Sequence, residues 1–210
     1  MSGYTRDSGA GSGYHLENNL ILNKKKTKEI VFHNRGRKPM IPPPTDGIER
    51  VTKLVKLGVT IQDSLSMKEH INAVLSSCTN MLYAMNILKM HGLPPSGLQQ
   101  VFNAKVLSKL TYASPAWCGL MGRDDVGRID SFLRRAKKFG YYSQDGKMFD
   151  ELCLKADDEL FKKVRTNTNH VLHRFLPEQK QVHYDLRKRK HSYVLPDRDD
   201  RNFINRILFK

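Results

Sequence analysis

The sequence is poor in cysteine, has no long apolar run and holds far fewer acidic than basic residues. Its cysteines are Cys78, Cys118 and Cys153, and this wide spacing predicts neither a disulfide framework nor a paired CxxC zinc site. No apolar run approaches the ~18 residues that cross a bilayer, and residues 1–15 lack the apolar segment of a signal peptide. We therefore expect an intracellular protein, nuclear or cytoplasmic, without a membrane partner.

The shortage of acidic residues leaves a strong positive charge. There are 36 Lys and Arg against 21 Asp and Glu, a formal net charge of +15 over 210 residues. Such a surface attracts polyanions, so nucleic acid is the leading partner. The alternative is a basic protein that binds acidic partners or RNA without specificity. With 39% hydrophobic residues, the chain can form one sizeable core, or one core and a small appended unit.

The sequence also lacks the Walker-type and GxGxxG loops that bind nucleotide phosphates. Its acidic runs are Asp124-Asp125 and Asp157-Asp158-Glu159. Converging carboxylates can bind a divalent metal or transfer protons, but each run stands where a helix is predicted to begin. Acidic side chains there cap free N–H groups and complement the helix dipole, so we expect structural roles for both runs.

Histidine and cysteine offer weaker candidates. His170 and His173 lie three residues apart on a predicted helix, a spacing that suits a shared metal, but no third ligand follows at a suitable distance. Cys153 could be a nucleophile with His170 as its base, but no sequence motif supports this pairing. We therefore predict no catalytic residue and no metal site, and a metal-dependent enzyme is the least favoured alternative.

Hydrophobic periodicity predicts short strands near residues 20–22, 30–32 and 51–61, then a long helix over residues 66–92. Ser66 and Glu69 fit a capping box at the start of this helix, and Gly92 fits its end. Its apolar stripe, at three- and four-residue steps, consists of Ile71, Val74, Leu75, Cys78, Leu82, Met85 and Leu88.

More helices are expected toward the C-terminus. The second begins just after Pro94-Pro95-Ser96 and runs to about Thr111, antiparallel to the first, and Pro115 is expected to end regular helix near Ser114. A third runs from the Asp124-Asp125 pair to Gly140 with its basic residues outward. A fourth begins near residue 148, a fifth runs from residue 157 to Pro177, and a short one spans residues 202–209.

Basic residues gather in four clusters, with Tyr141, Tyr142, Tyr184 and Tyr193 near them in the sequence. Cations that meet phosphates and aromatic rings that stack on bases are typical of a nucleic-acid groove. Solvated helix faces are an alternative explanation of the same clusters. The residues predicted to bind nucleic acid are Lys24, Lys25, Lys26, Lys28, Arg35, Arg37, Arg134, Arg135, Lys137, Lys138, Arg187, Lys188 and Arg189.

The order of several short motifs carries a resemblance. NNLILNKKKTKEIVF contains an LNxxKT pattern, VKLGVTI contains Leu57-Gly58, and LSMKEHI follows. LSKLTYASPAW, FLRRAKK, YDLRKRKHSYVLP and NFINRILF come later in the chain. In this order, over residues 18–210, the sequence resembles the C-terminal part of the reverse transcriptases of non-LTR, LINE-type retrotransposons of the jockey and CR1-like kind.

The resemblance implies an RNA-directed DNA polymerase with a palm, fingers and a helical thumb, in which catalytic aspartates bind two Mg ions. In this family a YADD-type motif precedes LNxxKT, but here YTRD at residues 4–7 offers only one carboxylate. Two-metal phosphoryl transfer needs carboxylates on both ions. We therefore expect no polymerisation by this chain and no cofactor in it.

The implied fold is α+β. It comprises a disordered leader (residues 1–17), a small antiparallel sheet that is a palm remnant (18–63), a mainly α-helical thumb-like region (64–178) and a basic C-terminal tail (179–210). By resemblance, Lys26 would lie near the incoming nucleotide and the hairpin at Leu57 and Gly58 near the primer end.

The predicted function is that of a truncated reverse transcriptase fragment that retains binding to RNA or DNA, with a primer–template duplex as the expected partner. The alternative is a non-functional or purely structural fragment derived from a retroelement. The sequence leaves the oligomeric state open.

Overall fold

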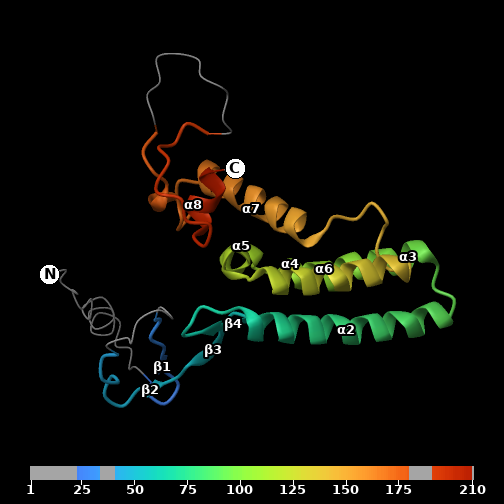
Figure 1. Ribbon diagram of the computed structural model, residues 1–210, viewed down its shortest axis with the longest axis horizontal. Coiled ribbons are helices and arrows are strands. Elements are labelled where there is room, and N and C mark those ends of the chain that lie inside the picture. Colours follow the sequence, from blue (N-terminus) through green and yellow to red (C-terminus); the bar gives the residue numbers. More distant parts are fainter. Residues whose placement is uncertain (1–22, 34–40, 180–190, 210) are drawn as a thin grey trace. The chain divides into compact units, whose positions relative to one another are not determined.

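The computed structural model describes residues 23–33, 41–179 and 191–209. The described chain divides into two compact units. The first holds the residues up to Lys56 together with Ile61–Leu65, and the second holds Leu57–Thr60 and the residues from Ser66 onward. Two short β-ladders precede the helices (Figure 1). The α+β class expected from the sequence is confirmed.

The first ladder pairs β1 (Lys28–Glu29) with β2 (Glu49–Arg50) in parallel. The Glu29 carboxylate accepts bonds from Thr45 Oγ1 at 2.7 Å and from Arg50 Nε at 2.7 Å, and these bonds fix the register. The strand expected at residues 30–32 is therefore wrong by two residues, and Phe32 in that stretch is 51% exposed. The strand expected at residues 20–22 lies outside the described residues.

The second ladder is the hairpin of β3 (Lys53–Lys56) and β4 (Val59–Gln62). Its two-residue turn holds Leu57 at φ 47° and Gly58 at φ 79°, and positive φ at both central residues is the mark of a type I′ hairpin turn. The run at residues 51–61, expected as one strand, thus folds back on itself. Only this ladder has the antiparallel pairing expected for the sheet.

The long helix α2 (Lys68–Met90) begins two residues later than its sequence predicts. Met67 is its N-cap, without a side-chain cap bond, so the capping box of Ser66 and Glu69 is wrong. Ser66 Oγ only accepts a long bond, 3.5 Å, from the Lys68 N–H. The end is as predicted: Gly92 has φ 85°, and the backbone bonds across it form a Schellman motif.

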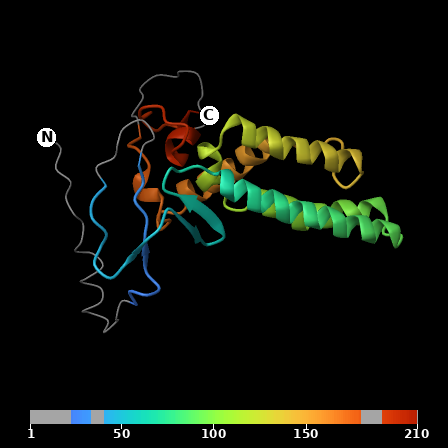
Figure 2. The same cartoon turned by 60° about the horizontal axis from the view of Figure 1, so that its bottom comes forward.

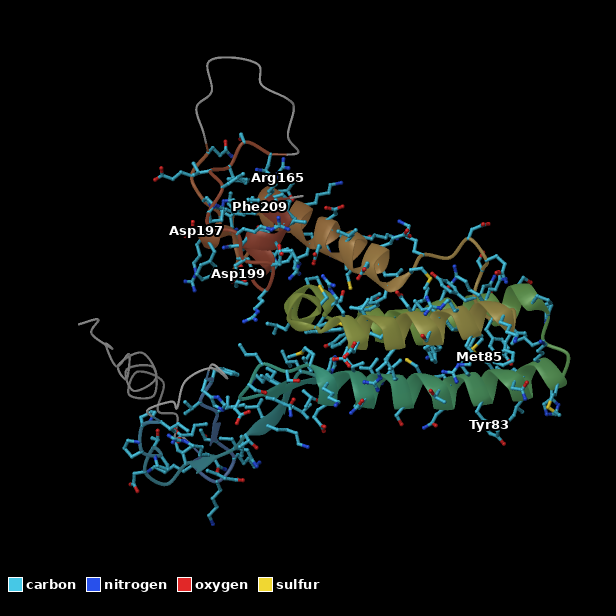
Figure 3. All side chains as sticks on the ribbon, in the orientation of Figure 1. Tyr83, Met85, Arg165, Asp197, Asp199 and Phe209 are labelled. Atoms are coloured by element: carbon cyan, nitrogen blue, oxygen red, sulfur yellow. The ribbon has the colours of Figure 1, made fainter. Side chains whose placement is uncertain are left out.

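A second helical segment packs antiparallel to α2, as expected (Figure 1). It consists of α3 (Pro95–Val101), a π-helical turn (Phe102–Leu107) and α4 (Ser108–Thr111), and it ends where the sequence predicts. Most of the α2 stripe is buried against its neighbours, although Leu88 remains 40% exposed. Figure 3 shows Met85 directed into this seam and Tyr83 directed away from it.

The junction after α4 differs from expectation. Regular helix already breaks at Ala113, which has φ 52°, and the short helix α5 (Ser114–Trp117) begins one residue before Pro115. Because the first turn of a helix does not need the N–H that proline lacks, Pro115 starts a helix here instead of ending one. Trp117 is buried and donates from Nε1 to the Tyr112 carbonyl at 2.9 Å.

Helix α6 (Arg123–Lys138) follows a short 3₁₀ turn and agrees with the sequence. Asp124 and Asp125 lie in its first turn, and its inward residues are buried. The chain leaves it through Gly140, with φ 79° and backbone bonds of the same Schellman form as at the end of α2. Figure 2 shows α6 and α2 running side by side.

Helix α7 (Phe149–Thr166) is one continuous helix where two were expected. Asp157 is not a cap: it lies inside α7 and is fully buried. The helix also ends eleven residues before Pro177, and only a 3₁₀ turn (His173–Phe175) follows. Within the predicted basic tail, α8 (Phe203–Leu208) forms as expected, with the Asn202 side chain as its cap.

The second unit holds two hydrophobic clusters. The larger joins α2, the π-helical turn, α4, α6 and the start of α7, and the smaller joins α7 to α8 through Phe161, Tyr193 and Ile207. In the described ranges, no helix combines the length and the apolar character needed to cross a membrane.

Candidate nucleic-acid interface

Helix α6 presents a face of basic and small side chains. Arg123, Gly127, Ser131 and Arg135 follow one another at four-residue steps, so they line one side of the helix. Together with Leu75 and Thr79 of α2 they border a groove of about 610 Å³, which we call the α2/α6 groove. Both Arg123 and Arg135 are exposed.

The arginines of this face differ in how they are held. Arg128 donates to Asp125 Oδ1 at 3.0 Å and to Asn72 Oδ1 at 2.7 Å, which fixes its guanidinium beside the groove. By contrast, Arg123 and Arg135 make no ion pair or side-chain hydrogen bond with any residue of the described ranges. Their guanidinium groups are therefore free for an anionic ligand.

The other basic residues of α6 that were predicted to bind nucleic acid also differ in how they are held. Lys137 is half-buried, donates from Nζ to the carbonyls of Gln144 (2.9 Å) and Gly146 (2.5 Å), and lies over the Tyr142 ring. It holds the loop after α6, so it is a poor candidate for a phosphate contact. Lys138 is exposed, and Arg134 is exposed with a bond to Ser131 Oγ.

The first unit carries another predicted cluster. The turn at residues 24–26 holds Lys24, Lys25 and Lys26. It is stabilised by Asn23, whose Oδ1 accepts a hydrogen bond from the Lys26 N–H. Lys24 is paired with Asp46 at 3.9 Å and Lys28 with Glu49 at 3.1 Å, and all four side chains are largely exposed. Exposed pairs of this kind are weak, so the pairing does not prevent a phosphate contact. Arg35, Arg37, Arg187, Lys188 and Arg189 lie outside the described residues.

The tip of the β3–β4 hairpin borders a second hollow, of about 630 Å³, which we call the hairpin pocket. Leu57 at the turn is 80% exposed, and Gly58 lies so close to Tyr112 that an added Cβ would meet the ring at 3.5 Å. Lys105 and Lys109, one helical turn apart, line the same pocket. A hairpin backbone, two cations and an exposed ring thus converge from segments some fifty residues apart.

His70 ties this hairpin to α2. Its Nδ1 accepts the Thr60 N–H at 3.4 Å, and its ring lies edge-on to Trp117 with centroids 5.0 Å apart. Burial lowers the pKa of His70, so the neutral ring, with the proton on Nε2, suits the bond from Thr60. In the described part of the chain, Nε2 has no hydrogen-bond partner.

The tyrosines expected to stack on bases do not lie on the surface. Tyr141, Tyr142 and Tyr193 are at most 9% exposed, and Tyr184 lies outside the described residues. Burial raises the pKa of Tyr142, whose ring stacks on Phe102 at 5.0 Å. Among the described residues, Tyr83 and Tyr112 are the exposed tyrosines, 72% and 55%, and of the two only Tyr112 lines the hairpin pocket. Its position at the end of the predicted second helix, just before the Ala-Ser-Pro run, was the available signal.

The acidic and histidine candidates have structural roles. Asp157 is held by Arg206, and the Nδ1 atoms of His170 and His173 are engaged with the Leu172 N–H and the Val164 carbonyl. No group of three or more His, Cys, Asp or Glu side chains in the described ranges could hold a metal ion. These residues therefore do not fit the Mg pair that the resemblance implies for intact polymerases.

The structure gives no support to Cys153 and His170 as a nucleophile and its base, a pairing that the sequence also does not favour. Cys153 is buried in α7, and a hydrogen bond with Cys118 together with burial raises the pKa of its thiol. A thiol that resists ionisation is a poor nucleophile.

Comparison of the chain with protein-family models, with curated proteins and with solved structures finds no match.

Proposed function

We propose that this chain is a fragment of a non-LTR retrotransposon reverse transcriptase that binds nucleic acid and does not polymerise it. The sequence resemblance supplies the family, and the net charge of +15 supplies the attraction for a polyanion. The observation that carries the proposal is the convergence of Gly58, Lys105, Lys109 and Tyr112 on the hairpin pocket.

The chemistry of this pocket suits the end of a nucleic-acid strand. The hairpin turn exposes backbone that a nucleic-acid strand can approach. Lys105 and Lys109, one helical turn apart, supply positive charge for its phosphates. The exposed Tyr112 ring offers a surface on which a base can stack, worth ~1–3 kcal/mol for each base in other proteins. Phosphate contacts carry no sequence information, so we expect binding without sequence preference.

The placement of the carboxylates in the described residues supports the proposal that the chain does not polymerise. Two-metal transfer requires several carboxylates that converge on both ions. The acidic runs of this chain lie at a helix start, at Asp124, and in a buried ion pair, at Asp157. Within the described ranges, neither run belongs to a group of three or more His, Cys, Asp or Glu side chains that could hold a metal ion.

A filter-binding titration of the full chain with a primer–template duplex tests the proposal. We expect an affinity that falls steeply with salt, and a Lys105→Gln/Lys109→Gln variant whose slope of log K against log salt is smaller by ~1.8, since each lost phosphate contact removes ~0.9. Lys162→Gln/Lys163→Gln on α7, which removes the same charge from exposed positions, is the matched control. Absent or salt-insensitive binding would reject the proposal.

A further inference from the structure

We infer that the α2/α6 groove binds the phosphodiester backbone of a single RNA or DNA strand without reading its bases. This inference rests on the nucleic-acid binding proposed above, but it concerns a different surface from the hairpin pocket and a different form of the ligand.

The shape of the groove suits an extended strand. Arg123 and Arg135 stand twelve residues apart on α6, which corresponds to ~18 Å along the helix. Between them lie Gly127 and Ser131, the smallest side chains of that face, and an added Cβ at Gly127 would meet nothing within 4 Å. The two arginines thus bracket an open trough that is long enough for several consecutive phosphates of one strand.

The charge of the groove suits an anion. The lining of the groove holds three guanidinium groups, those of Arg123, Arg128 and Arg135, and one carboxylate, that of Asp124. Arg128 is already oriented by Asp125 and Asn72, while the other two arginines are uncommitted within the described ranges. Guanidinium groups form paired, charge-assisted bonds to phosphate oxygens, so the groove offers two such contacts, at Arg123 and Arg135.

The lining of the groove favours phosphate contacts over base contacts. The aromatic residue in the lining, Phe132, is 2% exposed and cannot stack on a base. Recognition by phosphate contacts alone carries no sequence information.

A single strand explains the groove better than an acidic peptide does. Beside the groove, α6 carries two further exposed cations, Arg134 and Lys138, so the positive surface extends beyond the groove itself. A short acidic motif would leave the outer part of this surface unused.

The test measures binding of the full chain to oligo(dT) of ~16 nucleotides, the upper end of known single-strand site sizes, over a range of salt. We expect Arg123→Gln/Arg135→Gln to lower the affinity and to reduce the slope of log K against log salt by ~1.4, since each phosphate contact to a single strand contributes ~0.7. Arg123→Lys/Arg135→Lys should keep the slope, and Lys162→Gln/Lys163→Gln should match the wild type.

Three results would overturn the inference. The first is an unchanged slope in Arg123→Gln/Arg135→Gln while the wild type still binds the primer–template duplex, which leaves the proposed function intact. The second is poly-glutamate binding that depends on these arginines while oligo(dT) binding does not. The third is a wild-type chain that binds neither oligo(dT) nor duplex, which rejects both proposals. Unchanged thermal unfolding of each variant establishes that the effect lies in binding.

Discussion

Helices α6 and α7 are both rich in charged residues and use their charges in opposite ways. In α6, acidic residues occupy the first turn and basic residues point outward, so the charged side chains lie in solvent or beside a groove. In α7, the side chain of Asp157 is 1% exposed and meets Arg206 of α8. One helix exposes most of its charge to solvent, and the other uses a buried charge to hold the fold together.

The contrast shows in the contacts of Arg206. Its guanidinium donates to both oxygens of Asp157, at 3.1 and 3.0 Å, and also to the carbonyls of Pro115 and Asp200. Burial by itself lowers the pKa of Arg206, but the bonds to Asp157 outweigh it and the net pKa is raised. A single side chain thereby joins α5, α7 and α8.

The largest effect is expected from Asp157→Asn. It leaves the Arg206 charge buried without its partner, which in other proteins lowers the free energy of unfolding by ~3–5 kcal/mol. Urea unfolding measures the change. Asp158→Asn, at the exposed neighbouring position, serves as the control and should cost no more than about 1 kcal/mol. Equal losses in the two variants would mean that the buried pair has no special role.

Two glycines provide a second test of the same contrast. A Cβ at Gly119 would meet the Arg206 guanidinium and the Asp200 carbonyl oxygen, the latter at 2.5 Å, so Gly119→Ala should destabilise by ~1–3 kcal/mol. Gly127 lies in α6 with open space around it, and Gly127→Ala should stabilise by ~0.5–1 kcal/mol. Thermal unfolding of both variants measures the two changes. A shift of the melting temperature in the same direction in both variants would contradict this account.

The third prediction concerns pH. Because burial lowers the pKa of His70 below its ordinary 6.5, the unfolded chain takes up a proton before the folded chain does. His70 therefore contributes stability above pH ~6.5 that is lost as the pH falls below it. Unfolding at pH 7.5 and 5.5 should show a loss in the wild type that is smaller in His70→Phe. An identical loss in both chains would show that His70 does not titrate in this way.

The smallest effect on stability is expected on α6. Arg123→Gln/Arg135→Gln removes two exposed side chains that make no ion pair or side-chain hydrogen bond with the described residues, so the free energy of unfolding should change by no more than ~0.5 kcal/mol. Urea unfolding of this variant beside Asp157→Asn makes the comparison direct. A loss above 2 kcal/mol would show that these arginines also hold the fold.

Local signals in the sequence predicted α6, the antiparallel packing of α2 with the next helical segment, and the ends of α2 and α6 at Gly92 and Gly140. Each of these features depends on residues within one or two helical turns. The division of α7 was wrong because the acidic run at Asp157 looks like a cap. Its partner Arg206 lies 49 residues later, and no local pattern reports such a pair.

The candidate site was only partly predictable for the same reason. The basic residues of α6 could be read from the sequence, but the burial of Tyr141 and Tyr142 depends on contacts with Asn86 and Phe102. The hairpin pocket joins residues near Gly58, His70 and Tyr112, and only the tertiary fold brings these segments together.

The most direct test of the central claim measures binding and polymerisation in one reaction. The full chain is incubated with a labelled primer–template duplex, Mg²⁺ and all four deoxynucleotides, and the products are resolved on native and denaturing gels. We predict a salt-sensitive shift of the duplex on the native gel and no lengthening of the primer on the denaturing gel. Primer extension, or a duplex that is not shifted even at low salt, would contradict the account.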